Sequence, residues 1–198
     1  MAFKCILVGD HCVGKNKLAA ICSGIIPPGE NPPGAVEDQK VSISVDGIKH
    51  TINIISTEGS EDYAKLRPLS YPETDIFIVL FSIINYNSYS HVEKLWKPEI
   101  KEYCSDAPII LVGSYAEVRK NPEKLNSLAE RGITLISQEQ GEVMAKRIGA
   151  VQYIEWSDSD KDDVDFIFEE AVRACLKKSN EKSTDDKKDK DKRCCNLS

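Results

Sequence analysis

The stretch GDHCVGKNK, residues 9–17, combines residue types and a spacing that suit phosphate binding. In the pattern G-x-x-x-x-G-K-[ST], glycines let backbone N–H groups close around phosphates, the lysine reaches the terminal phosphates, and the hydroxyl binds Mg²⁺. Gly9, Gly14 and Lys15 match this pattern, but Asn16 stands where the hydroxyl belongs. The spacing alone is weak evidence for a phosphate-binding loop, and a turn that matches the pattern by chance is the alternative. Other segments of the sequence must distinguish the two.

The elements around this stretch predict where it lies. Short apolar or alternating runs predict a six-stranded sheet, with strands over residues 3–8, 41–45, 52–54, 76–81, 109–112 and 151–156. Segments with helical period lie between several of these strands, which predicts a three-layer α/β domain with a mostly parallel sheet and helices on both faces. Ligands of such sheets bind at the carboxyl ends of the strands, and the glycine-rich stretch leaves the first strand at that edge.

Composition narrows the class of protein. A chain of 198 residues is long enough for one well-cored domain and short for two. Its 41% hydrophobic and 29% charged residues exclude collagen-like, disulfide-framework and membrane-spanning chains. The cysteines are odd in number and lack metal-ligand spacing, so we expect reduced thiols. The N-terminus lacks signal-peptide features, which predicts a chain that stays in the cytosol, and the acidic body argues against nucleic acid as a partner.

Further segments decide against a chance turn. FKCILVGDHCVGK, VSISVDG, EDYAKLRPLSYPETDIFIVLFS, PIILVGS and EVMAKRIGAVQYIEWS occur in an order and spacing that resemble the Rho/Rac branch of the Ras-like small GTPases. Residues 66–75, LRPLSYPETD, are especially close to that branch, and residues 121–132 resemble its insert helix. The resemblance covers residues 3 to about 176. It implies a P-loop small GTPase fold over residues 1–178 that binds GTP or GDP.

The same resemblance implies that the metal-binding positions are altered. Asn16 replaces the Ser or Thr that binds Mg²⁺, although an amide oxygen could in principle reach the ion. Gly34 replaces the threonine of the first switch loop, and Ser56 replaces a carboxylate behind the metal. Mg²⁺ is therefore a doubtful cofactor, with Asn16 as its one candidate ligand.

The resemblance also implies that no catalytic residue is intact. Ser60 stands at the position of the glutamine that orients the attacking water. His11 stands where the family usually has glycine, and any side chain at that position crowds the third phosphate. Gly59, whose N–H would meet that phosphate, is retained, whereas Glu58 adds a negative charge near the phosphates. We expect weak or absent GTP hydrolysis.

The base-binding positions are partly retained. Glu117 keeps a carboxylate for the donors of guanine, Tyr115 stands where a lysine stem would lie, and Ser157 matches the family. The nucleotide site implied by the resemblance comprises Gly9, Asp10, His11, Cys12, Val13, Gly14, Lys15, Asn16, Ser56, Thr57, Glu58, Gly59, Ser60, Ser114, Tyr115, Ala116, Glu117 and Ser157.

The last residues, 179–198, mix charges of both signs and predict a disordered tail. The tail ends in a C-a-a-X box, which predicts prenylation of Cys195, and its final serine points to farnesyl. One prenyl chain anchors a protein only marginally, so palmitoylation of Cys194 is the expected second anchor. We expect a lipid-anchored protein on the cytoplasmic face of the plasma membrane or an endomembrane, with a cytosolic pool.

Two hypotheses of function follow. The first is a membrane-anchored Rho-type GTP-binding signalling protein with degenerate metal and catalytic motifs. The second is a pseudo-GTPase that acts as a nucleotide-independent adaptor or sequesters regulators. The resemblance implies a monomer with Rho-type exchange factors, effectors or dissociation inhibitors as partners, and actin-linked signalling. The effector region is altered at Asn31, Gly34, Glu37 and Gln39.

Overall fold

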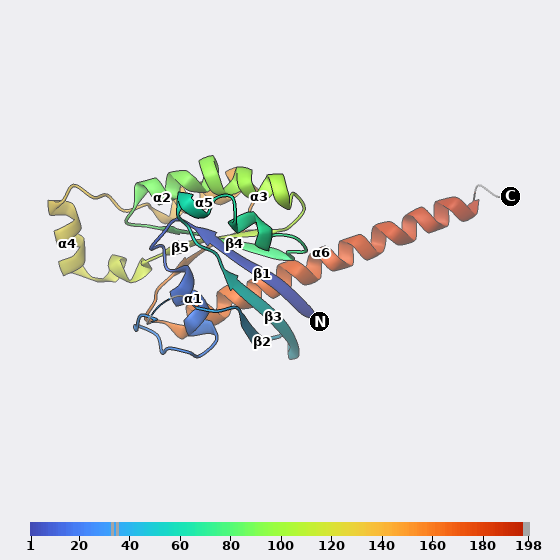
Figure 1. The fold of residues 1–198 in the computed structure, drawn as a ribbon, viewed down its shortest axis with the longest axis horizontal. Coiled ribbons are helices and arrows are strands. Elements are labelled where there is room, and N and C mark those ends of the chain that lie inside the picture. The colour runs from blue at the N-terminus through green and yellow to red at the C-terminus, as the bar shows by residue number, and fades with distance from the viewer. Residues whose placement is uncertain (33, 35, 196–198) are drawn as a thin grey trace.

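The computed structural model describes residues 1–32, 34 and 36–195, with side chains up to residue 181. Its described residues form a six-stranded sheet of order β2-β3-β1-β4-β5-β6 (Figure 1). The strands are β1 (Ala2–Gly9), β2 (Gln39–Val45), β3 (Ile48–Ser56), β4 (Ile76–Ser82), β5 (Ile109–Ser114) and β6 (Gln152–Trp156). β2 and β3 form an antiparallel hairpin, and the other neighbouring strands pair in parallel. The predicted α/β class is confirmed as a mixed sheet with helices.

Helices cover both faces of this sheet (Figure 1). The helical elements are α1 (Lys15–Cys22), η1 (Glu61–Tyr63), η2 (Arg67–Ser70), α2 (Tyr86–His91), the π-helical turn η3 (Val92–Trp96), α3 (Lys97–Tyr103), η4 (Ala116–Lys120), α4 (Pro122–Glu130), α5 (Gln138–Ile148) and α6 (Lys161–Cys195). α1 and α6 pack on one face, and η3, α3 and α5 pack on the other. None of the helices within the described residues is both long and apolar enough to cross a membrane.

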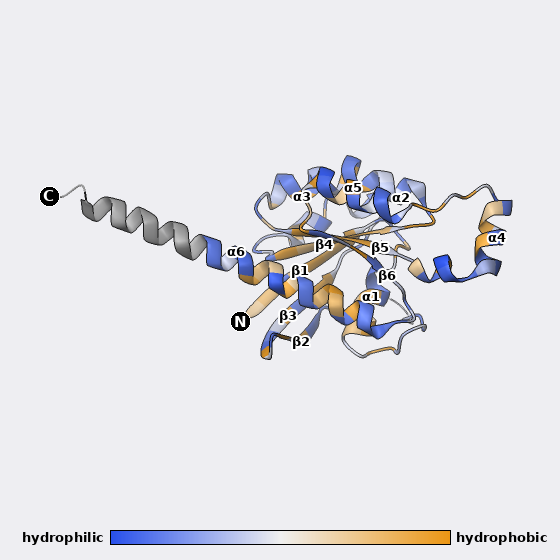
Figure 2. Ribbon diagram, turned by 180° about the vertical axis from the view of Figure 1, so that it is seen from behind, coloured by the Kyte–Doolittle hydropathy of each residue, from blue (hydrophilic) through white to orange (hydrophobic). Residues whose placement is uncertain are grey.

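The central strands are apolar throughout because both of their faces are buried. In β1, Cys5 and Leu7 belong to the core beneath α1 and α6, whereas Ile6 and Val8 belong to the core beneath η3, α3 and α5. This alternation follows from the two-residue period of a strand. Figure 2 shows the resulting apolar interior of the sheet. A strand packed in this way holds the loop that follows it in a fixed position.

The last helix, α6, is longer than the sequence predicts. Its first part packs on the sheet through Val164, Phe168 and Val172, and the backbone stays helical to Cys195 as the helix leaves the body of the domain (Figure 1). We expected disorder from residue 179, but no glycine or proline interrupts the helix there. The division into a domain over 1–178 and a tail stays a prediction. Residues 196–198 of the C-a-a-X box, and the side chains of both terminal cysteines, lie outside the described part, so lipidation also stays a prediction.

Candidate nucleotide-binding site

The glycine-rich loop leaves β1 at its carboxyl end and turns tightly into α1. Gly9 and Gly14 have φ angles of +145° and +95°, which residues with a side chain rarely adopt. A Cβ atom on Gly9 would overlap the Leu80 carbonyl oxygen, and one on Gly14 would lie 2.8 Å from the ring of Trp156. Gly9 is therefore required by the nearby backbone of Leu80, and Gly14 by the nearby ring of Trp156. Glycines at these two positions are part of the predicted phosphate loop.

Lys15 lies at the centre of this loop. Its Nζ donates hydrogen bonds to the carbonyl oxygens of Gly9, at 2.7 Å, and Asp10, at 2.6 Å. Burial lowers the pKa of Lys15 to about 8, and the carboxylates of Glu58 and Asp10 partly oppose that change. A buried ammonium group with so little compensating charge favours an anion close by. The arrangement can hold phosphate.

The loop is also tied to the helical layer. The Asp10 carboxylate accepts a hydrogen bond of 2.8 Å from Trp96 Nε1, and its other oxygen lies 2.7 Å from His91 Nδ1. Neither His91 nor Trp96 was predicted to take part in the site. They lie more than 80 positions away in the chain, and no local pattern marks such a contact.

The metal position does not fit Mg²⁺. The Ser56 hydroxyl donates a hydrogen bond of 2.6 Å to Asn16 Oδ1, so the amide oxygen at the position of the serine or threonine ligand is left with one free lone pair and carries no negative charge. Ser56 supplies no carboxylate charge, and the neighbouring Thr57 hydroxyl donates to the Leu7 carbonyl oxygen, at 2.8 Å. Mg²⁺ prefers an octahedral set of oxygens with at least one carboxylate. The residues present do not provide that set.

The loop over residues 56–60 presses against the phosphate loop. A Cβ atom on Gly59 would lie 2.7 Å from the backbone nitrogen of His11, and it would overlap the carbonyl oxygen of Gly9. The N–H of Gly59 donates to Glu58 Oε1 at 2.8 Å, and His11 Nδ1 lies 3.2 Å from the same oxygen. Glu58 thus bridges the two loops, a role that the sequence did not predict.

Arg67 anchors the loop over residues 56–60 through a backbone contact. It is 5% exposed, and its Nη1 donates to the carbonyl oxygen of Glu58 at 2.8 Å. The same guanidinium pairs with Glu99 at 2.6 Å and lies 4.5 Å from the centre of the Trp96 ring. The pairing with Glu99 outweighs burial and raises the pKa of Arg67. This buried cation is a positioning residue for the site.

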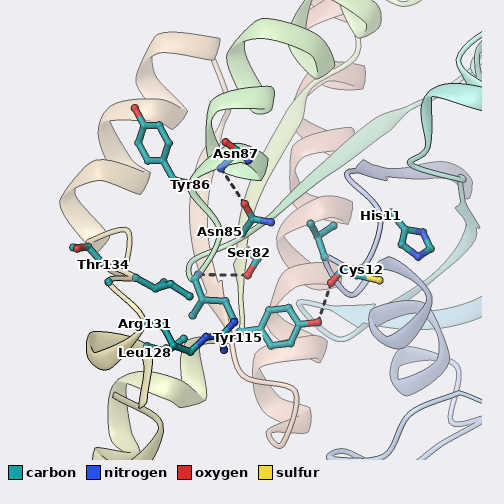
Figure 3. A pocket seen from close by; sticks show the side chains of 14 residues that line it. His11, Cys12, Ser82, Asn85, Tyr86, Asn87, Tyr115, Leu128, Arg131 and Thr134 are labelled. Atoms are coloured by element: carbon teal, nitrogen blue, oxygen red, sulfur yellow. Dashed lines mark hydrogen bonds between the residues drawn. The ribbon is translucent and has the colours of Figure 1, made fainter. Parts of the chain in front are cut away.

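The base side is organised by Tyr115, whose φ of +67° is unusual for a bulky residue. Its hydroxyl donates to the carbonyl oxygen of Cys12 at 2.9 Å, so the ring spans from one loop to the other (Figure 3). Glu117 Oε2 is buried and has no hydrogen-bond partner among the described residues, and burial raises the pKa of this carboxyl group. An unpaired buried acceptor is costly unless a ligand supplies donors.

The other predicted base-side residues have internal partners. The buried Ser114 hydroxyl donates to the Phe81 carbonyl oxygen at 3.0 Å. The Ser157 hydroxyl lies 2.9 Å from that of Ser159, and the Ser157 N–H donates to Asp163 at 3.0 Å. Lys17 contacts Asp158, which also accepts from the N–H of Gly29. The segment before the first switch loop is thereby tied to the loop after β6.

A cavity of about 310 Å³ lies over the phosphate loop. Of the predicted residues, its lining includes His11, Cys12, Gly14, Lys15, Asn16, Thr57, Glu58 and Tyr115, together with Asn31 and Gly34 of the predicted effector region. A larger cavity of about 720 Å³ shares His11, Cys12 and Tyr115 (Figure 3). The other predicted nucleotide-site residues do not line the phosphate cavity: Gly9, Asp10, Val13, Ser56, Gly59, Ser60, Ser114, Ala116, Glu117 and Ser157. Glu37, which precedes β2, and Gln39, its first residue, do not line it either.

The sheet, the glycine-shaped loop after its first parallel strand and the lysine at the centre of that loop define a P-loop nucleotide-binding protein. Comparison with known families gives a closer assignment. The model of the Ras family matches residues 4–177. The chain therefore belongs to the Ras family, whose members are small GTP-binding proteins, and guanine nucleotide is the ligand that this membership implies.

Proposed function

We propose that this chain is a Rho-type signalling protein that binds guanine nucleotide with little help from Mg²⁺ and hydrolyses GTP slowly or not at all. The observation that carries the binding is the cavity over the phosphate loop, with the buried Lys15 beneath it. Glu117 adds a buried acceptor without a partner among the described residues, which suits the N–H donors of a guanine base.

The Rho-type assignment is supported by two segments. Residues 66–75 carry the closest resemblance, and in the fold Arg67 and Tyr71 of this segment both hydrogen-bond to Glu99 of α3. Residues 121–132 contain α4, which Asn121 caps by accepting a hydrogen bond of 3.0 Å from the N–H of Lys124. A helix at this place, between β5 and α5, is what the Rho-type insert predicts.

Slow hydrolysis is supported by the residues that meet at the mouth of the phosphate loop. His11 and Glu58 contact each other there, and a side chain at either position takes space beside the phosphates. Ser60 lacks the amide that would orient a water molecule. With Asn16 and Ser56 bonded to each other, charge neutralisation falls to Lys15 and backbone N–H groups.

The decisive experiment is to denature freshly purified protein and chromatograph the supernatant. Stoichiometric GDP or GTP would support the proposal. An empty site, together with no change of melting temperature on adding either nucleotide with or without Mg²⁺, would overturn it. A single-turnover assay with radiolabelled GTP then tests hydrolysis, and a rate well above that of buffer would contradict the second part of the proposal.

A nucleotide-independent adaptor is the second candidate function. It is favoured by the Ser56–Asn16 hydrogen bond, which closes the metal position, and by the exposed side chains of Tyr63, Leu66 and Leu69 beside the second loop. Exchange factors, effectors or dissociation inhibitors of the Rho type are the proposed partners of that surface. Partner binding that is equal in the nucleotide-loaded and nucleotide-stripped protein would favour the adaptor over the switch.

For either function we propose a lipid anchor at the cytoplasmic face of a membrane, with actin-linked signalling as its context. The proposal rests on Cys195 in the C-a-a-X box, with Cys194 beside it as a palmitoylation site. The basic residues of the tail alternate with aspartates, so electrostatic attraction to anionic lipid is weak and a second acyl chain is needed. Mass spectrometry of protein from eukaryotic cells tests this, and an untrimmed, unmodified C-terminus would contradict it.

A further inference from the structure

We propose that the carboxylate of Glu58 takes the place of the third phosphate, so that the site is selective for guanosine diphosphate over guanosine triphosphate. This inference rests on the proposed nucleotide binding and goes beyond it, because it names the form of the nucleotide that the site accepts. Glu58 is then a specificity-determining residue supplied by the chain itself.

The Glu58 carboxylate contacts groups that could otherwise donate to a phosphate. Glu58 Oε1 accepts the N–H of Gly59 at 2.8 Å and lies 3.2 Å from His11 Nδ1. Partial burial raises the pKa of Glu58, but the contacts with His11 and Gly59 and the charge of Lys15 outweigh it and hold that pKa below its ordinary value. A backbone N–H, an imidazole and an ammonium group are the donors available to a phosphate at this end of the cavity. Glu58 already contacts the first two, and it lies within electrostatic reach of Lys15, whose Nζ donates to the carbonyl oxygens of Gly9 and Asp10.

The backbone at Glu58 is held in place on both sides. Arg67 donates to the Glu58 carbonyl oxygen at 2.8 Å and is itself buried and paired with Glu99. The next residue, Gly59, lies so close to the phosphate loop that even a methyl group would collide with the backbone. The backbone of this segment cannot approach further, and the buried anchor opposes its withdrawal, so the Glu58 side chain starts from a fixed point beside the cavity.

Electrostatic repulsion also disfavours a third phosphate. A third phosphate would bring additional negative charge next to an ionised carboxylate, in a site where the residues present do not fit the metal ion that could neutralise both. The Glu58 side chain is 41% exposed, so it borders the cavity without filling it. A diphosphate can therefore lie against Lys15 and the loop N–H groups while the contacts of Glu58 persist.

The test is calorimetric titration of nucleotide-stripped protein with GDP and with a non-hydrolysable imido analogue of GTP, in EDTA and again with Mg²⁺. We expect the wild-type protein to bind the triphosphate analogue at least about tenfold more weakly than GDP. Glu58→Ala removes the charge and frees the Gly59 N–H, and we expect it to lower this ratio at least about fivefold by strengthening the binding of the triphosphate analogue.

Two further variants separate charge from structure. Glu58→Gln keeps the shape and the acceptor oxygen, so it should fold normally and lower the ratio in the same direction. Glu61→Ala removes the same charge from the neighbouring η1 and should leave the ratio unchanged. Equal affinity of wild type for both nucleotides, or a ratio unchanged in both Glu58 variants, would overturn the inference while leaving nucleotide binding intact. Absence of binding of either nucleotide to folded protein would overturn both proposals.

Discussion

The two ends of the candidate site differ in whether their polar groups have hydrogen-bond partners within the chain. At the phosphate end, Lys15, Asn16 and Gly59 all bond to groups of the chain itself. At the base end, Glu117 Oε2 is buried and unpaired within the described part of the molecule. Unpaired buried groups are costly, whereas paired ones are not. A ligand would therefore have to compete with the chain's own hydrogen bonds at the phosphate end, whereas a ligand N–H that reached Glu117 Oε2 would meet an acceptor without a partner in the described part of the molecule.

The largest effect that we predict concerns the anchor of the phosphate end. Arg67→Ala leaves Glu99 without its cation in a largely buried position, where its side chain is 11% exposed. Breaking a buried pair by removing one partner costs about 3 to 5 kcal/mol, so the free energy of unfolding should fall by that amount in urea titrations. Arg147→Ala, which breaks the exposed pair with Glu93, is the matched control and should change little. Similar losses in both variants would contradict the role of Arg67 as an anchor.

A second prediction concerns the shape of the phosphate loop. Gly14→Ala places a methyl group 2.8 Å from Trp156 at a φ of +95°, and such overpacking costs about 1 to 3 kcal/mol. Gly24→Ala is the control, because Gly24 has a φ of +73° with nothing within 4 Å of its Cβ position. Both variants carry backbone strain, so the difference between their unfolding free energies measures the Trp156 contact. Equal losses of unfolding free energy in the two variants would mean that the Trp156 ring moves aside without cost.

A third prediction addresses the base end. Glu117→Gln retains one acceptor but loses the charge, so GDP affinity should fall about tenfold by calorimetry. Burial raises the pKa of Glu117 in the folded protein, so the folded state retains the proton longer than the unfolded state and loses stability as pH rises from the ordinary Glu pKa through the raised value. The ligand-free variant should therefore be more stable than wild type above that window, and the gain should vanish below it.

Glu123→Gln, on the adjacent α4, is the control for that experiment and should change neither quantity. A variant at position 117 that loses stability at neutral pH would show that the carboxylate has a favourable partner. The contrast between the two ends of the site would then disappear.

The smallest predicted effect is on the metal. The double variant Asn16→Thr with Ser56→Asp supplies a hydroxyl and a carboxylate where the chain now has an amide and a hydroxyl bonded to each other. Mg²⁺ should then strengthen GDP binding by up to about tenfold, whereas it should have little effect on wild type. A strong Mg²⁺ dependence in wild type would contradict the assignment of the Ser56–Asn16 pair as a closed metal position.

Local patterns in the sequence predicted the parts of the site that depend on one segment. The glycine spacing and the preceding apolar run located the phosphate loop, because the loop conformation and the buried strand both follow from neighbouring residues. The same holds for Lys15, whose partners lie within six positions of it. The strand assignments succeeded for the same reason.

The contacts that join distant segments were not predictable in this way. Glu58 meets His11 across 47 positions, and Asp10 meets Trp96 across 86, because the sheet order brings β1, β3 and β4 together. The sequence predicts a negative charge near the phosphates at position 58, but only the structure pairs that charge with Gly59 and His11. Charge-rich composition predicts a disordered tail, whereas the backbone of α6 is helical to Cys195, because nothing in that composition forbids a helix.

The two tryptophans of the chain contact the phosphate loop from opposite sides of the sheet. Trp96 donates to Asp10 from one core, and Trp156 lies beneath Gly14 in the other. Any ligand that shifts the loop alters the surroundings of both indole rings. Each of the variants Trp96→Phe and Trp156→Phe keeps one tryptophan. The fluorescence of the remaining indole therefore reports on one side of the loop without an attached dye.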